Sequence, residues 1–411
     1  MSEERVRSRG YIFYLVVLMG LVALVDQYLS LIETNAIPEI IAHFGIADNY
    51  FFYLQGIFGA VAFLVFVISY FADAWGRKIG ILILLILMGG AAVLIGLLGT
   101  LNLWLFMVLY AIVILATNVN MWTIPVAEES PAHRRGRNGS LAFLIGLIPL
   151  YALLGPKIID SFGWQWSYGF MGIFGLVLIL LWIPMKETHR WRTHRDEYKR
   201  SIGDFWRSLT TFKAKEWGYV LVTGLIYICW NVAFKMATGT VQIFYLQVLE
   251  FDPEKFDTIY TFAGLSTILG ALTVGFVLDK IGRIGSFLFS SAGAAISYVF
   301  MAVFGLGFLV FVYFFMSMFL GFLLVYISEM FETKIRATAV GFSLTLSRVG
   351  YVVGPILTAL IVPAAATPEA LSAYRLNYLI AAAIALLPLI ALLILKYEPK
   401  GKTLEEIQLE T

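Results

Sequence analysis

The chain of 411 residues has one cysteine, four histidines and little charge. Charged residues make up only 14% of it and hydrophobic residues 60%, whereas a soluble domain has about 25% charged residues. Together with a mean hydropathy of +0.85, this excludes a soluble globular domain and indicates an integral membrane protein. Because Cys229 has no second cysteine to pair with, the sequence also excludes an internal disulfide.

Signals for nucleic-acid binding and for enzyme chemistry are also missing. The net charge is only +2, from 29 basic and 27 acidic residues, which does not favour a nucleic-acid partner. The segment Gly401-Lys402-Thr403 lacks the upstream glycine of a nucleotide-binding P-loop. The histidines lack the spacing of metal ligands, and no nucleophile constellation stands out. We therefore expect no enzyme activity, no metal site and no cofactor.

The sequence does contain long apolar runs, of the length that a transmembrane helix of roughly 20 residues needs. One set lies at residues 11–34, 51–72, 79–99, 102–127, 140–158 and 164–185. A second set lies at residues 217–247, 258–279, 284–303, 306–328, 339–362 and 376–395. The sequence therefore predicts an all-α membrane protein with twelve transmembrane helices in two halves of six. The first run is longer than a signal-peptide core, so we expect it to be retained.

The basic residues alternate between loops in a way that fixes the orientation. With the N-terminus inside, the inner segments hold 24 Lys and Arg residues and the outer segments hold three. Cytoplasmic loops carry such an excess of basic residues. We therefore predict a multi-pass protein of the cell membrane with both termini in the cytoplasm.

The predicted halves are residues 1–185 and 217–397, joined by a cytoplasmic loop at 186–216 and followed by a tail at 398–411. Apolar residues recur at helical spacing in the loop. Ser201, with Asp204 three residues later, suits the start of a helix here. The apolar residues are Ile202, Phe205, Trp206, Leu209 and Phe212. The pattern predicts an amphipathic helix on the inner membrane face, with a simple linker as the alternative.

Three groups of residues recur at offsets of 206, 201 and 199. The matched groups are Asp73, Gly76 and Arg77 with Asp279, Gly282 and Arg283; Glu128 and Arg135 with Glu329 and Arg336; and Gly155 and Pro156 with Gly354 and Pro355. The repeat indicates two homologous halves. Parallel repeats of this kind place a substrate site between the halves near the membrane midplane and give alternating access by rocking.

These loops resemble the signatures of the major facilitator superfamily. The motifs that carry the resemblance are residues 73–78 and 275–283 for the superfamily, 129–137 for sugar porters, 398–407 for sugar porters and organic cation/anion transporters, and 329–339 with 347–355 for the organic-ion branch. The resemblance spans the whole chain and implies the major facilitator fold, transport without a cofactor, and a monomer.

The chain departs from the sugar porters where those proteins bind sugar. They carry paired glutamines in helix seven, where this chain has Lys235 and Met236, and a glutamine in helix five, where it has Phe143. The amides that would bind sugar hydroxyls are missing from both places. The signature loop also has Ser69 where the family usually has glycine.

Four ionisable residues lie within the predicted spans: Asp26, Glu33, Lys235 and Arg348. Each costs about 2.5–3.5 kcal/mol when placed centrally in lipid, so we expect them to face the protein interior or water. We hypothesise that Asp26 is the proton-coupling carboxylate, because burial favours its protonated form and a nearby cation its ionised form. A static ion pair is the alternative. Glu33 is a second candidate, or a solvated residue at the outer mouth.

Lys235 and Arg348 are the candidates for binding a substrate anion, because Arg can meet a carboxylate with two hydrogen bonds and Lys supplies a point charge. The alternative is that both only neutralise the two acids. Further polar residues could contact a ligand or hold helices together. These are Asn118, Asn120, Asn231, Gln242 and Tyr28.

The polar inner loops are candidates for gating. The residues are Asp73, Arg77, Glu128, Glu129, Arg135, Asp279, Arg283, Glu329 and Arg336. A helix C-terminus disfavours an anion, so we expect Asp73 to pair with Arg77 or with the N-terminus of helix eleven. Breaking and remaking such contacts would open and close the inner side.

The sequence therefore predicts a secondary transporter that is driven by the proton gradient and imports a small organic solute, with a carboxylate or a sugar acid favoured. A neutral-sugar symporter, an organic-cation or drug exporter, and a non-transporting membrane sensor are the alternatives. The expected partners are the substrate, protons and membrane lipid.

Overall fold

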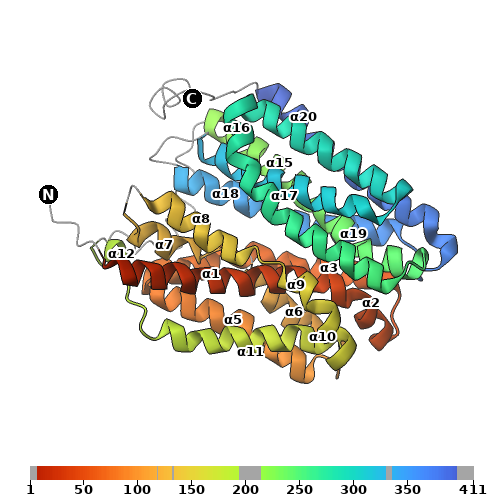
Figure 1. Cartoon of the computed structure of the whole chain (residues 1–411), viewed down its shortest axis with the longest axis horizontal. Helices are drawn as coiled ribbons and strands as arrows, with labels where there is room; N and C mark the ends of the chain where they lie inside the picture. Colours follow the sequence, from red (N-terminus) through yellow and green to blue (C-terminus); the bar gives the residue numbers. More distant parts are fainter. Residues whose placement is uncertain (1–6, 118, 132–133, 194–213, 330–335, 396–411) are drawn as a thin grey trace. The chain divides into compact units, whose positions relative to one another are not determined.

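The computed structural model describes residues 7–117, 119–131, 134–193, 214–329 and 336–395. These residues form helices joined by short turns, without a strand (Figure 1). The chain divides into two compact units. The first contains residues 1–44 and 61–207, and the second contains residues 45–60 and 208–411. The predicted amphipathic helix at 201–212 and the tail at 398–411 lie outside the described residues.

The first unit contains six of the predicted spans in whole or in part, and most of them are interrupted. Its helices are α1 (Arg9–Leu31), α2 (Glu33–Phe44), α4 (Val65–Trp75), α5 (Arg77–Leu98), α6 (Leu103–Thr117), α7 (Thr123–Glu129), α8 (Arg135–Gly146), α9 (Leu150–Leu153), α10 (Gly155–Phe162), α11 (Trp164–Trp182) and α12 (His189–Thr193). Ser8 caps α1 by accepting the Tyr11 N–H at 3.3 Å, which is the usual role of a serine at this position. α2 follows α1 directly after Ile32 and extends to Phe44, beyond residue 34, where the first span was predicted to end.

The second unit contains the six later spans and one helix from early in the chain. Its elements are α3 (Asp48–Gly59), α15 (Ala214–Gln242), the π-helical η3 (Ile243–Val248), α16 (Pro253–Phe304), η4 (Leu306–Phe308), α17 (Leu309–Glu329), α18 (Arg336–Ser347), α19 (Gly350–Ile361), η5 (Pro368–Ala370) and α20 (Leu371–Leu395). Asp48 anchors α3 here. Its N–H donates to the Ala364 carbonyl at 2.9 Å, and its carboxylate accepts from the Tyr374 hydroxyl at 3.1 Å.

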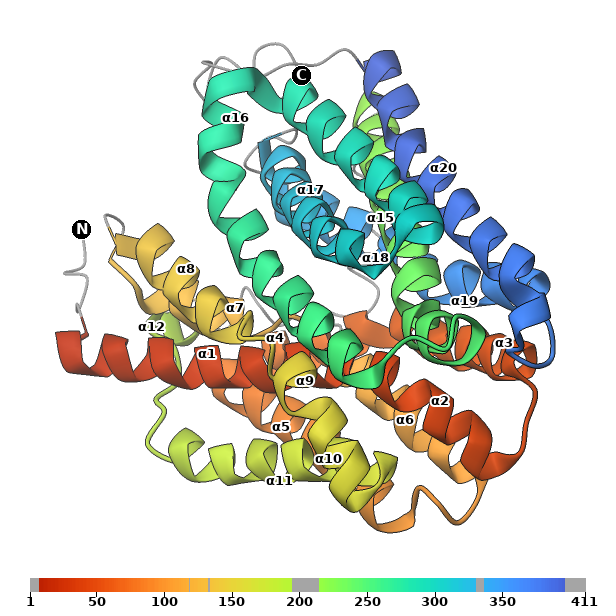
Figure 2. The same ribbon diagram turned by 45° about the vertical axis from the view of Figure 1, so that its right-hand side comes forward.

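The two matched glycines of the repeat have the same structural role. Gly76 separates α4 from α5 with φ of 114°, and Gly282 divides α16 with φ of 77°. Because only glycine adopts these positive φ values without strain, the chain turns at both places. Figure 2 shows α16 as two arms that meet at such a turn, and the arms hold the predicted spans 258–279 and 284–303.

Among the described residues, eight helical stretches are long and apolar enough to cross a membrane. The bent pair Arg137–Leu153 and Gly155–Phe162 makes a ninth. α16 accounts for two of the twelve predicted spans. The spans predicted at 51–72 and 102–127 are each broken, the first by η1 (Ala60–Leu64) and the second between α6 and α7. Each predicted span is therefore helical, but several are discontinuous.

Candidate functional site

Asp26 is a buried carboxylate on α1 of the first unit, with only 1% of its surface exposed. The indole Nε1 of Trp122 donates a hydrogen bond of 3.0 Å to its Oδ2. The hydroxyl of Ser30, one turn further along α1, lies 3.5 Å from Oδ1. Both of these donors are neutral and belong to the same unit as Asp26.

Trp122 reaches Asp26 from the break between α6 and α7. In this break Asn120 has φ of 51°, an unusual value for a residue other than glycine. The ring of Phe143 on α8 stacks on the Trp122 ring, with centroids 6.1 Å apart and an angle of 10° between the planes. Phe143 therefore packs against the indole that contacts Asp26. Asn118 lies outside the described residues.

Glu33 is the second buried acid of the first unit, with 4% of its surface exposed. It accepts a hydrogen bond from the Tyr110 hydroxyl of α6, a partner that the sequence pattern did not suggest. The hydroxyls of Tyr28 and Tyr168 are buried, and they have no hydrogen-bond partner among the residues that the structure describes. A buried hydroxyl without a partner is costly, so these groups suit a ligand or water.

Lys235 and Arg348 approach the same aromatic ring in the second unit. Lys235 Nζ lies 4.9 Å from the centroid of Tyr351, and the guanidinium carbon of Arg348 lies 5.9 Å from it. Both distances permit cation–π attraction. Arg348 is buried, with 5% exposed, and lies at the break between α18 and α19. The structure therefore brings together the two candidate anion-binding residues.

The polar residues of α15 tie it to neighbouring helices. The Asn231 side chain donates to the Ser347 carbonyl at 3.0 Å, beside the break that holds Arg348. Asn377 of α20 donates to the Met236 carbonyl at 2.9 Å, a contact that the sequence analysis did not identify. Gln242 is buried at the end of α15, where the helix becomes π-helical. Such π-helical turns often occur at functional sites.

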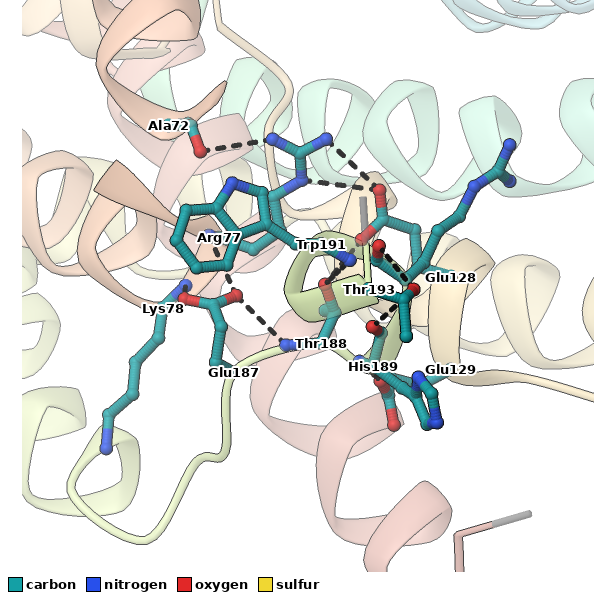
Figure 3. A network of polar contacts seen from close by, with 11 residues as sticks. Ala72, Arg77, Lys78, Glu128, Glu129, Glu187, Thr188, His189, Trp191 and Thr193 are labelled. Atoms are coloured by element: carbon teal, nitrogen blue, oxygen red, sulfur yellow. Dashed lines mark hydrogen bonds and ion pairs between the residues drawn. The ribbon is translucent and has the colours of Figure 1, made fainter. Parts of the chain in front are cut away.

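In the first unit, the loops that are predicted to lie on the inner side form a connected polar network (Figure 3). The Arg77 guanidinium donates to Glu128 Oε1 at 3.2 and 3.3 Å and to the Ala72 carbonyl at 3.1 Å. Arg77 and Glu128 come from different inner loops and were both predicted as gating residues. Their ion pair links those two loops.

Glu187 and Thr188, which follow the last span of the first unit, complete this network. Glu187 accepts the N–H groups of Arg77 at 2.9 Å and Lys78 at 3.1 Å, at the start of α5. A carboxylate is stabilising at a helix N-terminus. The Thr188 hydroxyl donates to Glu128 Oε2 at 2.6 Å. Neither residue was predicted from the sequence, because both lie at the start of a charged linker segment.

Glu129 connects the network to the N-terminal segment. It forms an ion pair of 2.5 Å with Arg7 and accepts the N–H of His189. Of the other predicted gating residues, Asp279 is exposed and Arg283 is half-buried. The side chains of Asp73, Arg135, Glu329 and Arg336 lie outside the described part of the chain, so the predicted pairing of Asp73 stays a prediction.

The sequence matches the Major Facilitator Superfamily over residues 16–326. It is 26% identical over 396 residues to the glucose transporter GlcP of Staphylococcus epidermidis, covering 82% of this chain and 83% of that protein. It is 26% identical over 225 residues to the sialic acid transporter NanX of Escherichia coli, covering 52% and 53%.

The fold is similar to the inward-open conformation of the xylose transporter XylE from E. coli. The TM-score is 0.74 at 17% identity, with 97% of this chain and all of that chain covered. Proteins of this family are transporters rather than enzymes, and their sugar porters need no cofactor. The family match over most of the chain and the helical fold lead to one conclusion: this chain belongs to the major facilitator superfamily and is a multi-pass membrane transporter.

Proposed function

We propose that the chain is a proton-coupled symporter of a small organic anion, with a sugar acid as the favoured class. The observation that carries this proposal is the position of Lys235 and Arg348 within 6 Å of the one Tyr351 ring. Two cations this close repel each other strongly in a medium of low dielectric constant. A carboxylate bound between them would be attracted by both and would offset this repulsion.

The two cations have complementary roles in this proposal. Arg348 supplies the planar fork that can donate two hydrogen bonds to a carboxylate, and Lys235 supplies a point charge. Arg348 is positioned by the break between α18 and α19, and discontinuous membrane helices commonly form transporter binding sites. The Asn231 side chain, which donates to Ser347, would support this break rather than contact the ligand.

The rest of a sugar acid needs partners for its hydroxyl groups. The buried amide of Gln242, at the end of the same helix α15 that carries Lys235, is the candidate within the second unit. The relative that is named for sialic acid supports this class, because sialic acid is a sugar acid. The relative that is named for glucose supports only the sugar part of it.

Asp26 is the proposed proton carrier. Its burial disfavours the charged carboxylate, whereas the N–H donated by Trp122 stabilises it. These opposing effects allow both protonation states to be populated during a transport cycle. Glu33, hydrogen-bonded to Tyr110, is the second candidate carrier.

Thermal stabilisation of the purified protein by ligands tests the substrate class. Sialic acid, gluconate, glucose and xylose are added separately to wild type, Arg348→Gln and Lys157→Gln. Because a ligand that binds the native state stabilises it, we expect the acids alone to raise the Tm of wild type and of Lys157→Gln, and neither acid to raise that of Arg348→Gln. Lys157 is exposed and serves as the charge-matched control.

Neutral-sugar symport is the second candidate, and it is favoured by the similarity to a glucose transporter over 82% of this chain. On this alternative, glucose or xylose raises the Tm and the acids do not. The effect then survives Arg348→Gln, and Gln242 becomes the first residue to mutate.

A further inference from the structure

A cavity of about 320 Å³ lies between the beginnings of α1 and α8 in the first unit. Four arginines line it: Arg7, Arg9, Arg134 and Arg137. Apolar side chains line the remainder, chiefly Ile12, Phe13, Val16 and Leu141. The cavity is thus basic on one side and apolar on the other, and none of these residues belongs to the proposed transport site.

Among the residues that the structure describes, the side chains that line the cavity keep a positive charge after their ion pairs are counted. Arg7 pairs with Glu129, and its guanidinium also lies 5.3 Å from the Tyr11 ring centroid. Arg9, Arg134 and Arg137 form no ion pair with another residue that the structure describes. Three cations therefore face one small space, which makes it complementary to an anion.

The cavity also lies at the edge of the predicted membrane-spanning region. Arg9 begins the apolar stretch of α1, and Arg137 begins the bent apolar stretch that starts in α8. The two helices lie side by side in both views (Figures 1 and 2). Phe13 is 71% exposed and Leu141 is 46% exposed, which suits side chains that contact lipid. By the distribution of basic residues this end is cytoplasmic.

We propose that this cavity binds the headgroup of an anionic phospholipid from the inner leaflet. The phosphate would lie between Arg9, Arg134 and Arg137, and the acyl chains would run along Phe13 and Leu141. Basic pockets between transmembrane helices on the cytoplasmic side are suited to such headgroups. The volume is at the lower end of the roughly 300–1,000 Å³ of small-molecule pockets, so it holds a headgroup and leaves the chains outside. The apolar side favours a lipid over a free anion.

Binding of fluorescently labelled phosphatidylglycerol to the purified full-length protein in neutral detergent tests this site by fluorescence anisotropy. The competitors are dioctanoyl-phosphatidylglycerol, dioctanoyl-phosphatidylcholine and inorganic phosphate. We expect only the phosphatidylglycerol to displace the probe at low concentration. The variant R9Q/R137Q should bind the probe about 25-fold more weakly, from about fivefold for each arginine near the surface.

Two further variants make the result specific. R192Q/K280Q removes two exposed cations elsewhere and should bind like wild type. R9K/R137K keeps both charges, so its affinity should fall by less than the roughly fivefold that loss of one surface cation costs. Binding by this variant shows that the two positions tolerate substitution. Equal weakening by R9Q/R137Q and R192Q/K280Q would overturn the proposal. So would displacement by phosphatidylcholine or by inorganic phosphate as effective as that by dioctanoyl-phosphatidylglycerol.

Discussion

The indole Nε1 of Trp122 donates a 3.0 Å hydrogen bond to Oδ2 of Asp26, although 96 residues separate the two in the chain. The contact joins α1 to the break between α6 and α7, and the ring of Phe143 stacks on the indole. A carboxylate that changes its protonation state can keep this partner throughout, because an N–H donates to a protonated or an ionised carboxyl group. The pair therefore suits a proton carrier that must not disrupt its surroundings.

Replacing Asp26 by Asn should separate proton coupling from substrate exchange. The amide oxygen of Asn still accepts the Trp122 N–H, but it cannot release a proton, so the fold is kept and coupling is lost. We expect uphill uptake driven by a pH gradient to fall at least tenfold in proteoliposomes, while exchange of labelled for unlabelled substrate continues. Asp160→Asn removes an exposed carboxylate of the same unit and is the control. Unchanged uphill uptake by Asp26→Asn would exclude Asp26 as the carrier.

Replacing Arg348 by Gln should weaken the transport of an anion specifically. Hydrogen bonds to charged groups contribute about 1.5–3 kcal/mol, so the KM for an acidic substrate should rise at least tenfold. Tyr351→Phe keeps the ring that both cations approach and should raise the KM less than threefold. A KM for the acid that stays within twofold of wild type in Arg348→Gln would remove Arg348 from the binding site.

Replacing Glu187 by Gln should destabilise the inner network. The carboxylate accepts two N–H groups at the start of α5, where a negative charge is favourable by about 1 kcal/mol. We expect a lower Tm for Glu187→Gln than for wild type in the same detergent. Glu39→Gln, at an exposed position of α2, should leave the Tm unchanged. Equal Tm values for Glu187→Gln and wild type would mean that the network does not stabilise the inner end.

Asp48 should make the stability of the protein depend on pH. Burial raises the pKa of its carboxyl group above the ordinary value of 3.8, against the opposing hydrogen bonds from Tyr374 and the backbone at Ala366. The folded state then binds a proton more tightly than the unfolded state, so this group's contribution to stability falls as pH rises from 3.8 through the raised pKa.

The variant Asp48→Asn tests this dependence, because it cannot titrate. Its Tm relative to wild type should increase as pH is raised from about 4 toward neutrality. Asp160→Asn, which changes an exposed carboxyl group, should show no such trend. A difference between Asp48→Asn and wild type that stays constant with pH would contradict the raised pKa.

Much of the fold could be predicted from the sequence, because apolar runs of membrane-spanning length leave few alternatives. The repeat also predicted a shared structural position for Gly76 and Gly282, which both take positive φ values. The breaks inside helices were not predicted. Those between α6 and α7 and between α18 and α19 lie within apolar runs. Each is held by a contact with a distant helix, through Asp26 of α1 in the first case and Asn231 of α15 in the second.

The site was predicted less completely. Asp26, Glu33, Lys235 and Arg348 could be identified because ionisable residues are costly in lipid and are therefore rare in apolar runs. Their neutral partners Tyr110 and Tyr351 carry no such signal, since tyrosine is common in membrane helices. Glu187 lies in a charged segment, where no sequence pattern distinguishes it from the other acidic residues. Its role follows from its contact with the start of α5, which is more than a hundred residues away in the chain.

Proton entry into proteoliposomes, followed with an internal pH dye while acids and neutral sugars are added outside, tests proton-coupled transport of a sugar acid most directly. We expect sialic acid or another sugar acid to acidify the lumen of vesicles containing wild type beyond that of protein-free vesicles. Glucose and xylose should not do so, and the signal should disappear with Asp26→Asn and Arg348→Gln. Acidification by neutral sugars alone, or substrate uptake without proton entry, would contradict it.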